Sequence, residues 1–169
     1  MSIRASLFYL GMKLSGMKKV YLYEEDKFLR IVRRMNQSRG FYMPKDKKAF
    51  YFDHMIFGKY HCLVIQNNRQ QAKRAILYFF GGGMMLGSDK GDVSVAGKLA
   101  KETGCDVWFP NYPPCTDHCI TESYDMAFEC YRQMIEQYGV QSGKIYAARQ
   151  DRRAGVHDFH VQRRLHRHQ

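Results

Sequence analysis

Apolar residues follow two patterns along this chain: continuous runs, and spacings of three or four residues. The change from one pattern to the other delimits the strands and helices that we expect. Runs of aromatic and β-branched residues predict strands. A strand pair joined by a short turn that contains Phe57, Gly58 and Lys59 predicts a hairpin. The predicted strands span residues 49–56, 60–65, 75–80, 105–109 and 144–148.

Apolar residues spaced three or four apart predict amphipathic helices between and before the strands. Two of them lie at residues 3–14 and 24–35. A third begins at Ser88 or Asp89 as N-cap and ends near Gly104, and the fourth runs from Thr121 as N-cap to Gly139. In the fourth helix one apolar face holds Tyr124, Ala127, Phe128, Tyr131, Ile135 and Tyr138.

The order strand, helix, strand, helix, strand from residue 75 predicts right-handed crossovers on a parallel sheet, with an antiparallel hairpin before it. We therefore expect an α/β fold with a mostly parallel sheet of about five strands and helices on both faces. The chain divides into an N-terminal helical segment at residues 1–44, an α/β domain at 45–148 and a basic tail at 149–169, expected to be disordered. The helical segment could form a cap over a pocket or pack as ordinary core.

The net charge of the 169 residues is +11, while a hydrophobic content of 45% excludes a disordered polypeptide. The tail holds six Arg and two Asp, so it supplies +4 of that charge. A basic tail can bind nucleic acid or anionic lipid. It lacks the interleaved aromatic residues that stack on bases, so nucleic-acid binding is the weakest hypothesis for this protein.

Five cysteines form no recognisable disulfide spacing, which favours reduced thiols and a cytoplasmic location. Cys115 and Cys119 flank Asp117 and His118, but their spacing differs from the usual C-x-x-C zinc knuckle. No metal and no cofactor is therefore expected. No stretch reaches the roughly 18 apolar residues of a membrane span, and no signal-peptide cleavage site follows the apolar N-terminus.

Three consecutive glycines, Gly81, Gly82 and Gly83, follow the predicted strand at 75–80 directly. Glycine adopts backbone conformations closed to other residues and lets its N–H group come close to a ligand. The run could be a flexible turn or an oxyanion-binding loop. The flanking sequence decides between these readings.

The sequence F-G-G-G-M-M-L-G-S after one strand, and D-V-W-F-P-N-Y-P-P-C-T-D-H along and after the next, resembles the α/β-hydrolase family. The branch it resembles is the esterases and lipases related to hormone-sensitive lipase, over residues 49–148. That resemblance implies hydrolysis of short acyl esters through a serine acyl-enzyme. It makes the Gly81–Gly83 backbone the oxyanion hole, supported by Phe80, Tyr112, Asp117 and His118. Phe80 replaces the family's His, and it cannot make that residue's hydrogen bonds.

The pattern of this family breaks after residue 148. A nucleophile elbow G-x-S-x-G should follow the fifth strand, yet Arg149 occupies the position of its first glycine and no Ser follows Ser142. Catalytic Ser, Asp and His are thus not identifiable, and the tail's histidines, His157, His160, His166 and His168, have no nucleophile to serve. A frameshift or truncation at residue 148 is the working hypothesis. It predicts an inactive fragment with an unpaired fifth strand, or a non-catalytic binding protein on the same fold.

Overall fold

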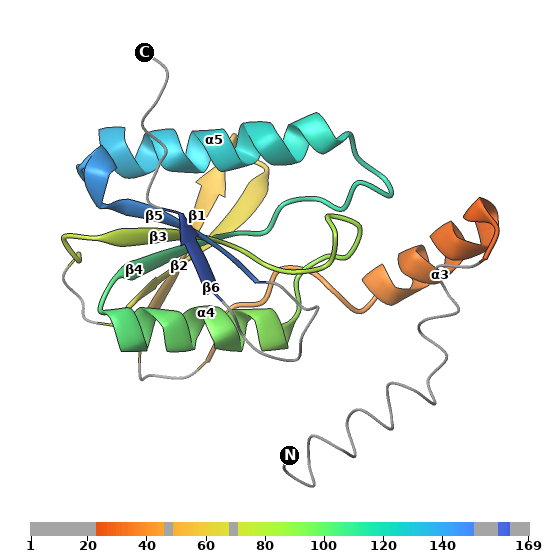
Figure 1. Cartoon of the computed structure of the whole chain (residues 1–169), viewed down its shortest axis with the longest axis horizontal. Coiled ribbons are helices and arrows are strands. Elements are labelled where there is room, and N and C mark those ends of the chain that lie inside the picture. The colour runs from red at the N-terminus through yellow and green to blue at the C-terminus, as the bar shows by residue number, and fades with distance from the viewer. Residues whose placement is uncertain (1–22, 46–48, 68–70, 151–158, 163–169) are drawn as a thin grey trace, which may run out of the picture. The chain divides into compact units, whose positions relative to one another are not determined.

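The computed structural model describes residues 23–45, 49–67, 71–150 and 159–162 (Figure 1). The chain divides into two compact units, residues 1–38 and 39–169. The first unit contains helix α3 (Glu25–Asn36), which has acidic residues in its first turn and basic ones in its last. Both charges suit the helix dipole, and α3 confirms the helix predicted at 24–35. The helix predicted at 3–14 lies outside the described residues.

The second unit is built on a six-stranded mixed sheet in the order β1-β2-β4-β3-β5-β6. Strands β3, β4 and β5 pair in parallel, while β1, β2 and β6 run antiparallel to their neighbours. The five predicted strands are all present. The bounds are β1 Phe50–Ile56, β2 Tyr60–Gln66, β3 Ala75–Phe79, β4 Asp106–Pro110, β5 Ile145–Gln150 and β6 Phe159–Gln162.

A tight turn joins β1 to β2, as the hairpin pattern predicts. Phe57 and Gly58 both have positive φ values, 52° and 66°, and Lys59 donates its N–H to the Ile56 carbonyl at 3.1 Å. Two positive φ values in the centre match the right-handed twist of paired strands. Phe57 adopts this conformation without being glycine, which costs of order 1 kcal/mol.

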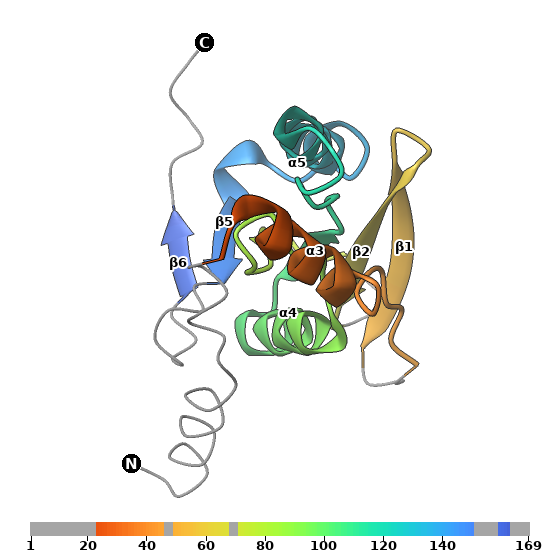
Figure 2. The same ribbon diagram turned by 90° about the vertical axis from the view of Figure 1, so that its right-hand side faces the viewer.

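Helices α4 (Lys90–Thr103) and α5 (Ile120–Glu136) cover opposite faces of the sheet (Figures 1 and 2). Asp89 is the N-cap of α4: its carboxylate accepts from the Asp92 N–H at 3.0 Å, and the Asp92 carboxylate accepts from the Asp89 N–H. Gly104 ends α4 with a left-handed φ of 65°. Both predicted ends of this helix are confirmed.

The predicted N-cap of α5, Thr121, is two residues too late, and the fully buried face of the helix is not the predicted apolar face. The helix begins at Ile120 with Cys119 as N-cap, and the Glu122 carboxylate accepts from the Cys119 N–H at 3.3 Å. Met126, Cys130 and Met134 are fully buried. The residues of the predicted face are exposed or half-buried, and Tyr131, Ile135 and Tyr138 among them pack partly against the core.

Strand β5 is longer than predicted and has a neighbour on each side. It continues through Arg149 and Gln150, and β6 pairs with it antiparallel, with Arg149 opposite His160. The expectation of an unpaired fifth strand is therefore wrong for the described residues. Of the tail predicted to be disordered, only residues 159–162 are described, so that prediction and the proposed boundaries at 44 and 148 stay predictions.

The core lies between the sheet and its two helices. Its largest fully buried side chains include Trp108, Tyr78 and Phe109. Tyr78 and Phe109 stack from neighbouring strands with ring centroids 5.6 Å apart. Among the helices of the described ranges, none is long and apolar enough to cross a membrane.

Candidate functional site

The candidate site is the loop that follows β3, at the carboxyl ends of the three parallel strands. In open α/β sheets this edge is where ligands bind. Gly82 and Gly83 have φ values of 143° and 62°, and Met84 continues the positive run at 60°. A side chain at Gly82 would place its Cβ 2.9 Å from the Leu86 Cβ. Only glycine fits there, so the loop needs glycine at this position for its shape.

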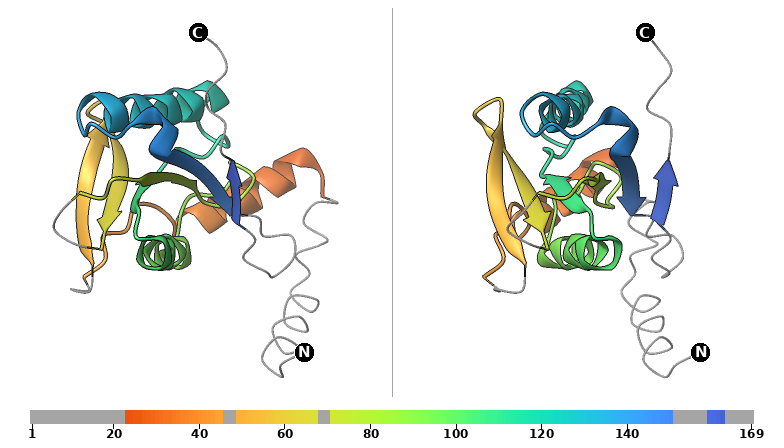
Figure 3. Two further views of the ribbon diagram at one scale, coloured as in Figure 1. Left: turned by 60° about the vertical axis from the view of Figure 1, so that its left-hand side comes forward. Right: turned by 90° about the vertical axis from the view of Figure 1, so that its left-hand side faces the viewer.

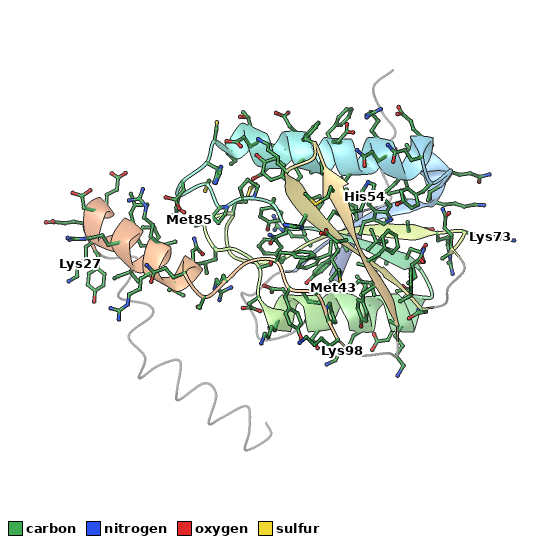
Figure 4. The ribbon with its side chains drawn as sticks, turned by 180° about the vertical axis from the view of Figure 1, so that it is seen from behind. Lys27, Met43, His54, Lys73, Met85 and Lys98 are labelled. Carbon is green, nitrogen blue, oxygen red and sulfur yellow. The ribbon has the colours of Figure 1, made fainter. Side chains whose placement is uncertain are left out.

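The loop folds back on itself through one carbonyl group. The Gly82 oxygen accepts from the N–H groups of Met85 at 3.2 Å and Leu86 at 3.3 Å. The N–H groups of Gly82 and Gly83 donate to no other described residue. Gly83 is exposed and Gly82 half-buried, so two backbone donors remain available to a ligand. Figure 4 shows Met85 on this loop, outside the sheet.

Phe80 and Tyr112 form an aromatic wall beneath the loop. Their rings stack with centroids 4.1 Å apart and planes 5° apart, and both side chains are buried. The Tyr112 hydroxyl donates to the Phe80 carbonyl at 2.6 Å. Tyr112 therefore fixes the backbone immediately before the glycines, and Phe80 contributes packing where the resemblance expects a His.

Two further contacts join the glycine loop to the loop after β4. The Cys115 N–H donates to the Met84 carbonyl at 2.8 Å. The buried hydroxyl of Ser88 lies 2.6 Å from the Asn111 Oδ1 and 3.0 Å from the Gly40 carbonyl oxygen. These bonds hold the glycine loop at both of its ends. A rigid backbone is what a preorganised anion site requires.

Charged residues brace the same region from the start of the second unit. The Arg39 guanidinium lies 3.0 Å from the Asp89 carboxylate and donates to the Gly87 carbonyl at 3.0 Å. The Gly40 N–H donates to the Ser88 carbonyl at 2.9 Å. Residues 39–40 are thus part of the support of the loop, although they lie within the segment predicted to be a separate helical region.

Asp117 and His118 lie at the far end of the second loop, and both are exposed. Asp117 accepts from the Thr116 hydroxyl at 3.0 Å. The His118 Nδ1 lies 3.6 Å from the carboxylate of Glu122, which also accepts from the Tyr60 hydroxyl. That hydroxyl, above all, holds the pKa of Glu122 below its usual range. His118 is thus placed at the first turn of α5.

The position predicted for a nucleophile elbow is part of a regular strand. Arg149 lies opposite Phe79 in the parallel pairing of β5 with β3, and opposite His160 in β6. An elbow requires a sharp turn from strand to helix that lifts its Ser out of the sheet. Residues 149 and 150 make no such turn.

Titratable side chains of the described residues offer no metal centre. No group of three or more His, Cys, Asp and Glu side chains is placed to share a metal ion in these ranges, Cys115 and Cys119 included. The five cysteines all lie in described parts of the chain, and each is a free thiol. The glycine loop itself offers backbone N–H donors, which can face an anion or a polarised carbonyl.

Sequence reasoning missed three residues that hold the loop. The sequence patterns assign Ser88 only a capping role and Asn111 none, and they offer Cys115 only as a metal ligand. The sequence carries a signal for two of them, because Ser88 and Asn111 are polar residues close after neighbouring parallel strands, where their side chains meet. The Cys115 contact is made by its backbone, which no side-chain pattern reveals.

This strand order, with a glycine loop after β3 and a tyrosine-bearing loop after β4, is that of the N-terminal part of the α/β-hydrolase fold. The sequence matches no protein-family model and no curated protein. Solved structures do share the fold. They include EstE5 soaked with p-nitrophenyl butyrate, with a TM-score of 0.58 and 19% identity over 72% of this chain and 40% of that one.

Two further solved structures give the same picture. An esterase from the bacterial hormone-sensitive lipase family has a TM-score of 0.56 and 19% identity over 76% of this chain and 41% of its own. An esterase/lipase from an uncultured bacterium has a TM-score of 0.58 and 18% identity over 73% and 41%. The chain thus spans about two fifths of the length of these proteins.

Proposed function

We propose that this chain forms the oxyanion-binding part of an esterase- or lipase-type α/β-hydrolase whose substrates are short acyl esters. The observation that carries the proposal is the glycine loop, where the N–H groups of Gly82 and Gly83 have no partner among the described residues. The fold shared with solved esterases supports the same conclusion.

The proposed chemistry is stabilisation of negative charge on a carbonyl oxygen. When a nucleophile attacks an ester, its carbonyl oxygen becomes an oxyanion that backbone N–H groups at about 2.7–3.1 Å can hold. One such donor contributes about 3 kcal/mol to the stability of the transition state. The stack of Phe80 on Tyr112 and the Cys115 bond to Met84 keep the donors in place without reorganisation.

We further propose that the described residues do not complete a catalytic triad. Arg149 replaces the first glycine of the elbow, and its backbone is paired on both sides. Among the described residues, we assign no side chain the role of the nucleophile that would be acylated. The chain accordingly binds an acyl ester or its anionic mimic and does not form an acyl-enzyme.

A titration of the ¹⁵N-labelled protein with the monoanion of ethyl butylphosphonate tests the oxyanion loop. This probe is a tetrahedral anion with a short acyl-like chain. We expect saturable shifts of the Gly82 and Gly83 amide resonances. Gly82→Ala should abolish these shifts because it reshapes the loop, whereas Gly143→Ala should retain them, since Gly143 has open space around it. Unshifted Gly82 and Gly83 amides in the folded wild-type protein would refute the proposal.

Hydrolysis of p-nitrophenyl butyrate tests the absence of the nucleophile separately. The expected result is a rate equal to that of buffer, with no initial burst of p-nitrophenolate. A burst of about one equivalent per chain would show that an acyl-enzyme forms. Burst-free protein that still binds the phosphonate is the result expected of a non-catalytic binding protein on this fold, which the continuous β5 strand favours over an active esterase.

A further inference from the structure

Helix α5 carries a second apolar stripe that the sheet does not cover. Three members of this stripe are strongly exposed: Ile120 at 43%, Tyr124 at 61% and Phe128 at 68%. Ala127, Tyr131 and Ile135 extend it as half-buried residues. Exposed aromatic side chains that form a continuous stripe mark an interaction surface, while scattered ones do not.

No other helix of residues 39–150 lies beside α5. Helix α4 covers the opposite face of the sheet, so α5 is alone on its own face (Figures 2 and 3). The fully buried side chains of Met126, Cys130 and Met134 pack toward the sheet. Tyr131 and Ile135 also pack partly against the core, so the exposed part of the stripe, Ile120, Tyr124 and Phe128, is what can contact another molecule.

We propose that this stripe is a self-association surface, on which α5 of a second copy packs antiparallel. The stripe consists of residues 120, 124, 127, 128, 131 and 135. Its intervals of four, three, one, three and four residues read the same in both directions. Two antiparallel copies thus place Ile120 against the partner's Ile135 and Tyr124 against the partner's Tyr131. A two-fold axis then passes near residues 127 and 128, as an isologous interface requires.

The charges beside the stripe agree with this register. Asp125 and Arg132 flank the stripe on the same side of the helix, one turn before and one turn after Phe128. In this register Asp125 lies opposite the partner's residue 130, two positions from the partner's Arg132, whose long side chain reaches the carboxylate, twice per dimer by symmetry. Arg132 already bonds Glu129 and Glu136 of its own helix, which fixes its direction, whereas Asp125 has no partner among the described residues. The partner's Arg132 supplies the cation that Asp125 lacks.

The size of the stripe sets the strength of the association. Each exposed aromatic side chain contributes on the order of 100–150 Å², so two copies bury roughly 800 Å² in total. A stable dimer needs about 1,200 Å² or more. We therefore expect a reversible dimer with a dissociation constant of roughly 10 µM or weaker.

Sedimentation equilibrium of the full chain over roughly 5–500 µM tests the proposal. The wild-type mass should rise from that of the monomer toward that of the dimer and no further. Phe128→Glu should weaken association at least about tenfold, because it places two carboxylates at the axis. The control Met55→Glu changes an apolar side chain of 40% exposure on the face of β1 opposite to that of His54, which contacts α5, and it should associate like wild type.

The register is tested through Asp125. Asp125→Asn removes the attraction and should weaken the dimer about two- to fivefold, while Asp125→Arg opposes two like charges and should weaken it further. Thermal unfolding of each variant checks that the fold is retained. A wild-type chain that stays monomeric, forms assemblies larger than a dimer, or dimerises equally well with Phe128→Glu overturns the proposal. So does an Asp125→Arg variant that associates as tightly as Asp125→Asn.

Discussion

Alanine substitutions at neighbouring glycines provide a direct test of the geometry of the loop. Gly82 has a φ of 143°, and an added Cβ would lie 2.9 Å from the Leu86 Cβ and 3.2 Å from the Leu86 carbonyl oxygen. The backbone strain costs about 1–3 kcal/mol and the overlap a similar amount. Gly82→Ala should therefore destabilise the protein by about 2–5 kcal/mol.

Gly83 is the matched comparison because its φ of 62° is also left-handed but an added Cβ has open space. Gly83→Ala should cost only about 1 kcal/mol, the price of an alanine in this conformation. Gly143→Ala, with neither a positive φ nor a close neighbour, should leave stability nearly unchanged.

Urea unfolding followed by the fluorescence of Trp108 measures the three variants on one scale. Trp108 is the only Trp of the chain and is buried in the core, so its emission reports the packing of the sheet. The midpoint should shift while the slope stays constant, as for a change in stability alone. Equal losses for Gly82→Ala and Gly83→Ala would refute the argument, because only the first residue faces a steric barrier.

Three further predictions concern the supports of the loop and the core. Tyr112→Phe leaves the buried Phe80 carbonyl without its hydroxyl donor and should lower the free energy of unfolding by about 1–2 kcal/mol in the same urea assay. His54→Ala, on β1 (Figure 4), removes hydrogen bonds to Gln133 of α5 and to Tyr138 beyond the end of that helix, and an edge-on contact with Trp108. The free energy of unfolding should therefore fall by about 2–3 kcal/mol with altered fluorescence of the native state. The Arg132 guanidinium holds the pKa of Glu129 below its usual range. The carboxylate therefore stabilises the fold while it is ionised, and this stabilisation is lost as pH falls below about 4.3. In Glu129→Gln, urea midpoints measured across this pH range should decline less steeply than in wild type.

The sheet could be predicted from the sequence because burial on both faces requires unbroken apolar runs. The predicted strand at 75–80 and the observed β3 differ by one residue, at Phe80, where the backbone leaves the sheet to enter the glycine loop. The caps of α4 could also be predicted, since Asp89 and Gly104 act through local geometry. Local rules succeed wherever the determining contacts lie within a few residues.

The face of α5 could not be predicted, because two stripes of this helix are apolar and periodicity alone does not rank them. Packing selects the stripe with the smaller, unbranched side chains of Met126, Cys130 and Met134, which fit closely over the sheet. Tyr124 and Phe128 remain outside. The positive φ of Met84 could not be predicted either, because the residue is not glycine and its carbonyl bonds to the backbone of Cys115, which is distant in sequence.

The support of the glycine loop is separate from the strand that would present a nucleophile. Tyr112 and Asn111 bond to the loop from the end of β4, and Arg39 bonds to it from the start of the second unit. All three residues precede β5 in the chain. Since these contacts fix the backbone from Phe80 to Ser88, the conformation of the loop does not require an elbow at residue 149. A preorganised anion site can thus persist on this fold where the β5 backbone runs straight, and binding of an anion is separable from turnover of an ester.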